Sequence, residues 1–240
     1  MTAPPRASAP RSNVPGPPET VDRCDTALGE WVLRRRVDPD GRLVFEIVAN
    51  GAFLMDSREH GTEERLADVA LGGLPRSGGL SVLVGGLGFG YTLRAVLEDD
   101  RLERVTVVEL APAVVDWMRG PVAYLSGAPL DDPRVDVVVG DVGAFLGADR
   151  QQPWDAVVLD VDNGPEFLVH EHNAPLYSAA GLRRCREVLR PGGRMALWSS
   201  ERSPRCLADL ARVFDGATEH VFPVEREGRR FDYYVYAATR

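Results

Sequence analysis

Short apolar runs alternate with helix-like stretches from residue 80 onward, and this alternation constrains the fold more than any other feature. A continuous apolar run is typical of a strand buried on both faces, as in a parallel sheet. One intervening stretch starts at Pro112, a residue that suits the first turn of a helix. We therefore expect an α/β fold with helices on both faces of a parallel sheet. The runs cover residues 81–84, 105–108, 135–139, 155–159 and 194–198.

Strand patterns of another kind flank this region. Residues 217–223 and 230–238 predict an antiparallel hairpin that closes one edge of the sheet. Residues 31–55 hold three short strand patterns, separated by turn sequences at residues 38–41 and 50–51. We expect three parts: a disordered Pro-rich tail over residues 1–22, a small β-meander over 23–57, and the α/β domain over 58–240.

Charge and composition exclude several classes of function. The chain has 240 residues, carries a formal net charge of −8 and contains no lysine. The absence of lysine excludes Schiff-base catalysis and any phosphate loop that needs a lysine. An acidic chain without a basic cluster is not expected to bind nucleic acid.

Cysteine usage and hydropathy bear on the compartment. Cys24, Cys185 and Cys206 are widely spaced and match neither a metal pattern nor a disulfide framework. This usage predicts a reducing, cytoplasmic location. No apolar run approaches the ~18 residues of a membrane-spanning helix, so no membrane partner is expected.

A glycine loop, Val84-Gly-Gly-Leu-Gly-Phe-Gly90, follows the first apolar run and opens the first helix. Glycine lets the backbone approach a ligand, and a helix N-terminus offers free N–H groups. Such a loop can also be no more than a tight turn. Glu109 ends the next run, about 20 residues on, where an acid accepts hydrogen bonds from ribose hydroxyls. Together the two features predict a nucleoside-bearing cofactor, either a dinucleotide or S-adenosylmethionine.

The third apolar run ends in Gly140-Asp-Val142. An acid at this strand end can accept a hydrogen bond from the adenine amino group, while Val142 packs on the ring. Taken alone, Asp141 fits the N-cap of the next helix equally well. Its place in the series of glycine loop, ribose acid and strand-end acid favours the ligand interpretation.

Acidic residues follow the fourth apolar run. Asp160 and Asp162 leave the sheet at the edge where ligands of open α/β sheets bind, and they could orient an amine or take its proton. The alternative is turn chemistry, because Asp, Asn, Gly and Pro are turn formers. We expect no metal site, since the His-Glu-His spacing puts no two ligands on one helix face. Further polar residues of the same loop are Glu166, His170, His172 and Tyr177.

The order of these features resembles that of the class I S-adenosylmethionine-dependent transferases, and residues 30–238 are similar to their spermidine synthase-like family. That family carries GGGDGG after its first strand, where this chain has Gly85-Gly-Leu-Gly-Phe-Gly90, and DSSDP after its fourth, where this chain has Asp160-Val-Asp-Asn-Gly. Glu109 and Asp141 match its ribose and adenine acids. The resemblance implies a Rossmann-like class I methyltransferase sheet with a terminal antiparallel hairpin, preceded by a small N-terminal β-meander.

Three departures from the family pattern bear on the reaction. Gly88 stands where the family has an Asp that binds the amine end of decarboxylated S-adenosylmethionine. That Asp would repel the carboxylate of the intact cofactor, so Gly88 favours intact S-adenosylmethionine. Asn163 stands where the family has an Asp that acts as base on the attacking amine, and an amide cannot take that proton. The family's Tyr-His-Glu segment reads Thr62-Glu-Glu64 here.

We therefore expect a methyltransferase that uses S-adenosylmethionine on a small-molecule acceptor such as an amine. Methyl transfer is an in-line displacement, for which the protein supplies mainly alignment and water exclusion. The resemblance also implies a homodimer paired through the N-terminal strands. The expected catalytic residues are Asp160, Asp162 as first candidate for a base, and Tyr177. The expected cofactor-binding residues are Gly85, Gly86, Gly88, Gly90, Glu109, Leu110, Asp141, Val142 and Asp160.

Two other functions stay open at this point. Asp160, Asp162 and Glu166 could pair with a cationic amine, which keeps polyamine aminopropyl transfer from decarboxylated S-adenosylmethionine as the alternative reaction. A non-catalytic nucleoside-binding scaffold is the alternative from another class. A dinucleotide oxidoreductase is disfavoured, because the regular GxGxxG spacing is missing.

Overall fold

The apolar runs form a sheet whose side chains point alternately to two faces. The structure, a computed structural model, describes residues 16–75, 77–148, 153–226 and 229–240. In β5 (Leu80–Gly85), Val82 and Val84 pack into one hydrophobic cluster, whereas Leu83 packs into a second cluster on the opposite face. Because both faces are buried, every position of this strand has to be apolar or small.

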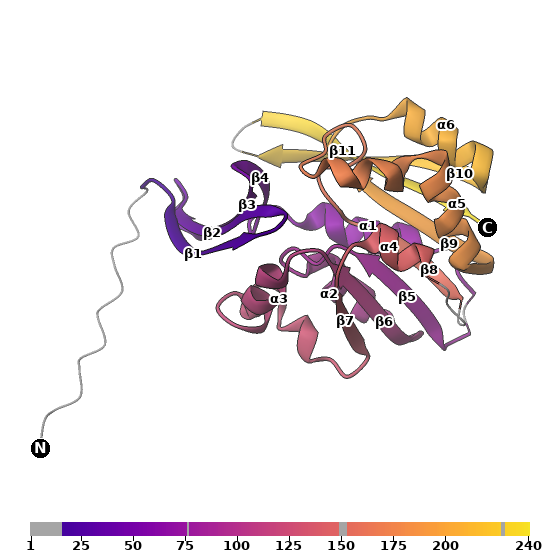
Figure 1. The fold of residues 1–240 in the computed structure, drawn as a ribbon, viewed down its shortest axis with the longest axis horizontal. Helices are drawn as coiled ribbons and strands as arrows, with labels where there is room; N and C mark the ends of the chain where they lie inside the picture. Colours follow the sequence, from indigo (N-terminus) through magenta and orange to yellow (C-terminus); the bar gives the residue numbers. More distant parts are fainter. Residues whose placement is uncertain (1–15, 76, 149–152, 227–228) are drawn as a thin grey trace, which may run out of the picture.

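The central sheet has seven strands in the order β10-β11-β9-β8-β5-β6-β7 (Figure 1). Strands β5 to β9 run parallel, while β11 pairs antiparallel with β9 and β10 pairs antiparallel with β11. The predicted α/β sheet with a terminal antiparallel hairpin is confirmed. The remaining strands are β6 (Leu102–Glu109), β7 (Val135–Val139), β8 (Trp154–Leu159), β9 (Leu189–Ser199), β10 (Asp215–Arg226) and β11 (Arg229–Thr239).

Helices cover both faces of this sheet. The first three contribute to one hydrophobic cluster and the last three to the other. The helix expected from Pro112 begins at that residue. The helices are α1 (Gly61–Leu71), α2 (Tyr91–Leu97), α3 (Pro112–Arg119), α4 (Val142–Gly147), α5 (Ala179–Val188) and α6 (Pro204–Val213), with 3-10 turns η1 (Ala123–Ser126), η2 (Pro129–Asp131) and η3 (Glu171–Tyr177).

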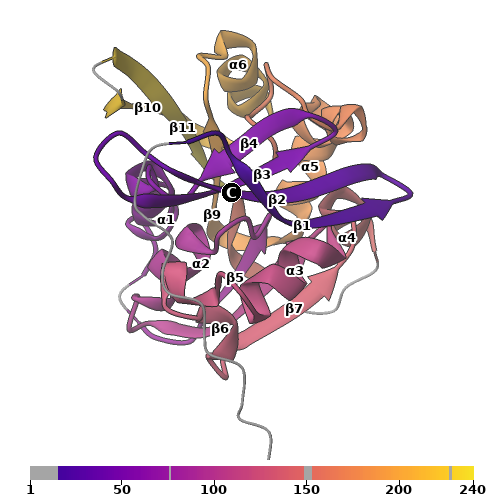
Figure 2. The same ribbon diagram turned by 90° about the vertical axis from the view of Figure 1, so that its left-hand side faces the viewer.

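An antiparallel sheet of four strands precedes the central domain, in the order β1-β2-β3-β4. Viewed from its own side, this sheet lies across one end of the central domain (Figure 2). The turn between β2 and β3 forms as its sequence predicts, since the Asp38 carboxylate accepts hydrogen bonds from the backbone N–H groups of Asp40 and Arg42. The strands are β1 (Glu19–Thr26), β2 (Gly29–Val37), β3 (Leu43–Ala49) and β4 (Ala52–Asp56).

The expected boundary between tail and meander is corrected by β1. Residues 1–22 were expected to be disordered, but β1 begins at Glu19 and pairs with β2 along its length. Its side chains are mostly exposed, so no apolar alternation revealed it. The indole N–H of Trp117 in α3 donates to the Asp22 carboxylate at 2.7 Å and ties the strand to the central domain. Residues 1–15 of the predicted tail lie outside the described residues.

Two further boundaries differ from prediction. The Pro191-Gly-Gly193 segment was expected to precede a strand at residue 194, yet it lies inside β9. Gly192 donates its N–H to the Arg240 carbonyl and Gly193 accepts from the Arg240 N–H, so pairing with the chain end extends the strand. The terminal hairpin also continues past Pro223. Proline is tolerated there because β10 is the edge strand of the sheet.

The two sheets share one hydrophobic core. Leu33 and Ile47 of the N-terminal sheet belong to the same cluster as Leu66 of α1 and Val84 of β5. Burying both sheets in one cluster fixes the N-terminal strands over the ends of the parallel strands. Within the part of the chain that the structure describes, no helix combines the length and apolar composition that a membrane crossing needs.

The shared core predicts cooperative unfolding. Leu33 is fully buried, at 0% exposure, so Leu33→Ala should lower the free energy of unfolding of the whole chain by about 2–5 kcal/mol. Urea unfolding followed by circular dichroism should keep a single transition. Leu43→Ala, at a side chain 47% exposed, is the matched control and should stay within about 0.5 kcal/mol of the wild type. A separate early transition in Leu33→Ala would contradict the shared core.

Candidate active site

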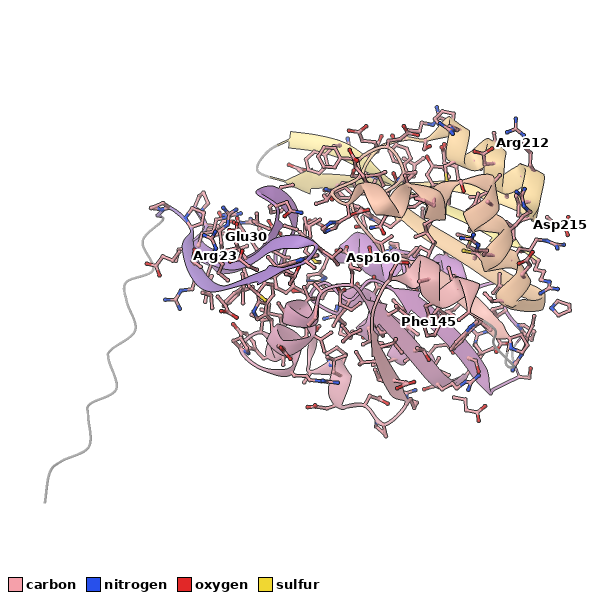
Figure 3. All side chains as sticks on the ribbon, in the orientation of Figure 1. Arg23, Glu30, Phe145, Asp160, Arg212 and Asp215 are labelled. Atoms are coloured by element: carbon pink, nitrogen blue, oxygen red, sulfur yellow. The ribbon has the colours of Figure 1, made fainter. Side chains whose placement is uncertain are left out.

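A cavity lies where the N-terminal sheet meets the carboxyl ends of the parallel strands. Its walls combine β2, β3 and β4 with the residues that follow β5, β6, β7 and β8, and with the start of α1. Asp160, at the end of β8, lies between the two sheets near the middle of the molecule (Figure 3). The cavity brings together eight of the expected site residues: Gly86, Gly88, Glu109, Leu110, Asp141, Val142, Asp160 and Asp162.

The glycine loop forms one wall of the cavity. Gly86 has φ +91°, and a Cβ at this position would overlap the backbone carbonyl of Asp160. Gly88 has φ +49° and faces Met55 of β4, with a built Cβ 2.5 Å from the methionine Sδ. Position 86 therefore needs glycine because the Asp160 backbone lies so close, whereas a side chain at position 88 would have to displace the end of the Met55 side chain.

The other two expected loop glycines do not line the cavity. Gly85 is the last residue of β5, and a Cβ there would sit 3.0 Å from side-chain atoms of Leu159 and Val142. Gly90 is the left-handed residue before α2, with φ +74°. Their roles in this structure are packing and helix entry.

The close approach at Gly86 predicts a strict size limit. Gly86→Ala should lower the free energy of unfolding by about 1–3 kcal/mol, because the methyl group meets backbone rather than a movable side chain. Gly147→Ala is the matched control: its Cβ has open space, and the change should stabilise by about 0.4–1 kcal/mol. Urea unfolding of both variants checks the pair, and a neutral Gly86→Ala would contradict the described contact.

The Glu109 carboxylate accepts a hydrogen bond from the glycine loop. This carboxylate is only 6% exposed, with Oε2 accepting from the Leu87 N–H and Oε1 from the Ala111 N–H, both at 2.8 Å. Burial raises the pKa of Glu109, and the backbone N–H groups oppose that shift. The backbone N–H groups of Gly88 and Leu110 act on the carboxylate as well, and its contact with a ribose hydroxyl remains a prediction.

Asp141 caps α4 and also lines the cavity. Its Oδ1 accepts from the Ala144 N–H at 2.6 Å and caps α4, as the alternative proposed. The residue also lines the cavity beside Val142. The cap fixes the carboxylate at the strand end, while the predicted contact with adenine remains a prediction.

Asp160 is anchored from two sides. Its N–H donates to the Gly85 carbonyl, and its Oδ2 accepts from the Thr92 hydroxyl of α2 at 2.6 Å. Burial raises its pKa, and the Thr92 hydrogen bond lowers it. Thr92 was not among the expected site residues, because nothing in the sequence marks it as a partner of a strand end far along the chain.

The Asp162 carboxylate accepts hydrogen bonds from residues of its own loop. The residue has a left-handed backbone, φ +52°, and its Oδ2 accepts from the Asn173 side-chain amide at 2.7 Å while Oδ1 accepts from the His170 N–H. The carboxylate lines the cavity, yet its hydrogen bonds hold the loop together. The side chain of Asn163, the next residue, donates to the Phe53 carbonyl instead.

Tyr177 does not reach the cavity, contrary to the expected catalytic role. The side chain is buried, and its hydroxyl donates to the Val161 carbonyl at 2.8 Å. Burial raises its pKa well above the ordinary value, which disfavours the phenolate a base would need. Tyr177 therefore fixes the loop that follows β8.

Several cavity residues were missed by sequence reasoning. Trp31 comes from β2 and stacks on the His170 ring with 5.3 Å between centroids, and Trp198 comes from β9. In the sequence the two tryptophans read as ordinary strand residues. Glu63 reads as an acidic residue in the first turn of a helix, where acids are common. Only the packing of α1 and the N-terminal sheet over the strand ends brings these residues together.

Glu63 is the most perturbed of these groups. Its side chain is 8% exposed, and its Oε2 accepts from the Thr62 hydroxyl, which in turn accepts from the Trp198 indole N–H. Burial and the negative charge of nearby Asp160 raise the pKa of Glu63 to about 8. The Glu63 carboxyl therefore holds its proton at neutral pH and loses it under mildly alkaline conditions.

This raised pKa predicts a pH-dependent stability. A Glu side chain in the unfolded chain has a pKa of about 4.3. Between about pH 4.3 and 8 this side chain is therefore ionised in the unfolded chain, whereas Glu63 in the folded protein stays protonated. Ionisation is then easier in the unfolded state, and the stability contributed here falls as pH rises through this window. The midpoint of thermal unfolding of Glu63→Gln should therefore rise relative to wild type from pH 5 to 8. Glu103→Gln, at an exposed position of β6, is the control and should show no such trend; parallel curves for Glu63→Gln would contradict the assignment.

The cavity is strongly acidic. Five carboxyl groups line it, and among the described residues no arginine does. No group of His, Cys, Asp and Glu in the described part of the chain is arranged to hold a metal ion. Such a lining favours a ligand that carries positive charge and no anion. The five residues are Glu63, Glu109, Asp141, Asp160 and Asp162.

Comparisons with known proteins bear on this geometry. The chain matches the family described as "Spermine/spermidine synthase domain" over residues 59–226. It is 30% identical to putrescine N-methyltransferase 2 of Nicotiana tabacum over 66% of this chain and 44% of that protein. It is 34% identical to polyamine aminopropyltransferase 1 of Streptomyces coelicolor over 75% of this chain and 32% of that protein. The chain thus spans less than half the length of these curated relatives.

Solved structures share the fold. The spermidine synthase of Thermotoga maritima superposes with a TM-score of 0.73 at 19% identity, covering 92% of this chain and 72% of that one. A spermidine synthase in complex with the transition-state analogue AdoDATO gives a TM-score of 0.72 at 18% identity, with the same coverage of both chains. At these identities the likeness concerns the fold, including the N-terminal sheet that precedes the central domain.

Proposed function

This chain belongs to the spermine/spermidine synthase domain family, and from that premise we propose that it transfers the aminopropyl group of decarboxylated S-adenosylmethionine to a small cationic amine. The observation that carries the proposal is the cavity lined by five carboxyl groups and, among the described residues, by no arginine. The decarboxylated donor carries a sulfonium and an ammonium and no carboxylate. The carboxylate of the intact donor would meet like charges there, without a cationic side chain to offset them.

The donor's nucleoside fits the strand ends. Glu109 would accept from the ribose hydroxyls, and Asp141 from the adenine amino group. Val142 and Leu110, which also line the cavity, would pack on the base. Gly86 and Gly88 would let the chain of the donor pass along the loop. These roles follow from the resemblance and from the positions of the residues around one cavity.

The acceptor would contact aromatic and acidic residues that line the same cavity. Trp31 and Trp198 offer aromatic faces there, and a cationic amine is attracted to such faces. Asp160, held by Thr92, would face the amine from the strand end. The names of both kinds of relative, putrescine N-methyltransferase and polyamine aminopropyltransferase, support an amine acceptor.

The reaction needs alignment above all. The amine nitrogen attacks the propyl carbon bound to sulfur, that carbon–sulfur bond breaks, and methylthioadenosine leaves with the bonding pair on sulfur. The protein holds nucleophile and carbon in line, an effect equivalent to several kcal/mol of barrier.

Methyl transfer from intact S-adenosylmethionine is the second candidate. Gly88 favours it, because no loop carboxylate stands where the family pattern has one. The similarity to putrescine N-methyltransferases 1 and 2 of Nicotiana tabacum and Nicotiana attenuata also supports it. In that reaction the same amine would attack the methyl carbon, and S-adenosylhomocysteine would leave.

A donor comparison tests the proposal. The purified chain is incubated with putrescine and either donor, and the products are identified by mass spectrometry. We expect spermidine from the decarboxylated donor, at a rate at least tenfold above methylation by the intact one. N-methylputrescine as the main product would overturn the proposal in favour of methyl transfer. Binding of either donor without any product would favour the non-catalytic scaffold.

A variant pair sharpens the donor test. A side chain at position 88 would meet Met55, so the substitution is made in a Met55→Ala background. Gly88→Asp adds a carboxylate to the loop and should raise the preference for the decarboxylated donor further. Gly88→Asn, of the same shape without the charge, is the control. Equal donor preference in both variants would contradict charge as the basis of selection.

A further inference from the structure

We propose that Glu63 is the catalytic base that takes the proton from the acceptor ammonium. This inference rests on the proposed function and assigns one residue a step within it. The sequence resemblance implies a base at position 163, where this chain has an asparagine. Either another residue removes the proton or the acceptor must arrive uncharged, which an amine with a pKa near that of lysine, ~10, rarely is at neutral pH.

Other candidates for the base already form hydrogen bonds within the fold. The Asn163 amide has no basic lone pair at neutral pH and donates to the Phe53 carbonyl. Asp162 accepts from the His170 N–H and from the Asn173 amide, so both of its oxygens hold the loop. The Tyr177 hydroxyl lies outside the cavity. Of the acids on the acceptor side, Asp160 and Glu63 remain.

Glu63 is placed for the task by three elements. It projects from the first turn of α1 into the cavity that also contains Asp160 and the two tryptophans. The Thr62 hydroxyl donates to its Oε2, and the Trp198 indole N–H donates to that hydroxyl, so a chain of hydrogen bonds orients the carboxylate. Burial and the repulsion by Asp160 raise the pKa of Glu63, so its carboxylate is a better proton acceptor than an exposed one.

The step balances in protons and electrons. The ammonium R–NH3⁺ gives one proton to the Glu63 carboxylate and becomes R–NH2 with a free lone pair. That pair forms the new nitrogen–carbon bond while the carbon–sulfur pair passes to sulfur. The product is a secondary ammonium and a neutral thioether, and the Glu63 proton returns to solvent. When ionised, Asp160 would offset the positive charge that remains on the amine.

Glu63 interacts electrostatically with Asp160 and Glu59, while the nearby cation Arg94 of α2 pairs with Glu64 and lies over the Tyr91 ring. A pKa of about 8 means that the Glu63 carboxylate is the minor form at neutral pH and becomes dominant above pH 8. A bound cation stabilises the carboxylate, so in the complex its pKa lies lower. The titratable groups that interact with it or share its cavity are Glu59, Tyr91, Glu109, Asp141, Asp160, Asp162 and His170.

The test compares pH profiles of kcat with saturating putrescine and the donor that the wild type turns over. Wild-type kcat should rise with pH to a plateau, with a midpoint at or below about 8. Glu63→Gln should lower kcat about 100-fold or more and abolish the rise, since general-base catalysis contributes that much. Glu63→Asp should retain the rise with a lower plateau. Glu64→Gln, on the same helix and outside the cavity lining, should behave as the wild type.

Proton release gives a readout that does not depend on turnover. Calorimetric titration with putrescine in buffers of different ionisation enthalpy counts the protons released at pH 7. The wild type should release close to one proton, because the arriving cation ionises Glu63. Glu63→Gln should bind putrescine and release none, and the thermal midpoint of this variant verifies that it is folded.

The outcomes separate the inference from the proposed function. Turnover by Glu63→Gln within threefold of wild type, with the pH rise intact, overturns the role of Glu63 and leaves the transfer standing. Loss of the rise in His170→Gln alone assigns the proton to that residue and likewise overturns it. A wild type that neither binds putrescine nor forms product overturns the proposed function, and the inference falls with it.

Discussion

Every carboxyl group in the cavity is held by a donor of the fold, and the rest of the site depends on this compensation. Glu109 has two backbone N–H groups, Asp141 has the N–H of a helix start, and Asp160 has a threonine hydroxyl. A buried carboxylate without such a partner would cost several kcal/mol. These donors all belong to the central domain, so the acids at the strand ends are held there, and the N-terminal sheet adds further walls to the cavity.

The same compensation explains how the site selects charge. Hydrogen bonds from neutral groups satisfy the acids without cancelling their negative field, which an arginine would have done. A cation entering the cavity between the two sheets would therefore meet the field of several carboxylates. In the proposed reaction, selection for a sulfonium and an ammonium would be a property of the whole acidic lining, of which position 88 is one part.

The sequence predicts well what depends on neighbouring residues. Helix starts, strand ends, the glycine loop and the acids at the strand ends are local patterns, and the order of the strands makes Gly86, Glu109, Asp141 and Asp160 meet at one edge. Strand β1 was not predicted, because its mostly exposed side chains show no alternation of apolar and polar residues. The positions of Trp31 and Glu63 in the cavity were not predicted. They depend on how the N-terminal sheet and α1 pack over the strand ends, and no local sequence pattern encodes this packing.

The position of Glu63 shows why function is harder to predict than fold. A reaction that needs a proton acceptor near a given point can take it from any element that reaches the point. In this chain the loop after β8 has an asparagine at the expected place, and α1 supplies a buried carboxyl from the other side of the cavity. Burial that destabilises this carboxylate also gives it the basicity that proton transfer from an amine requires. The stability lost at Glu63 and the chemistry proposed for it therefore have one physical cause.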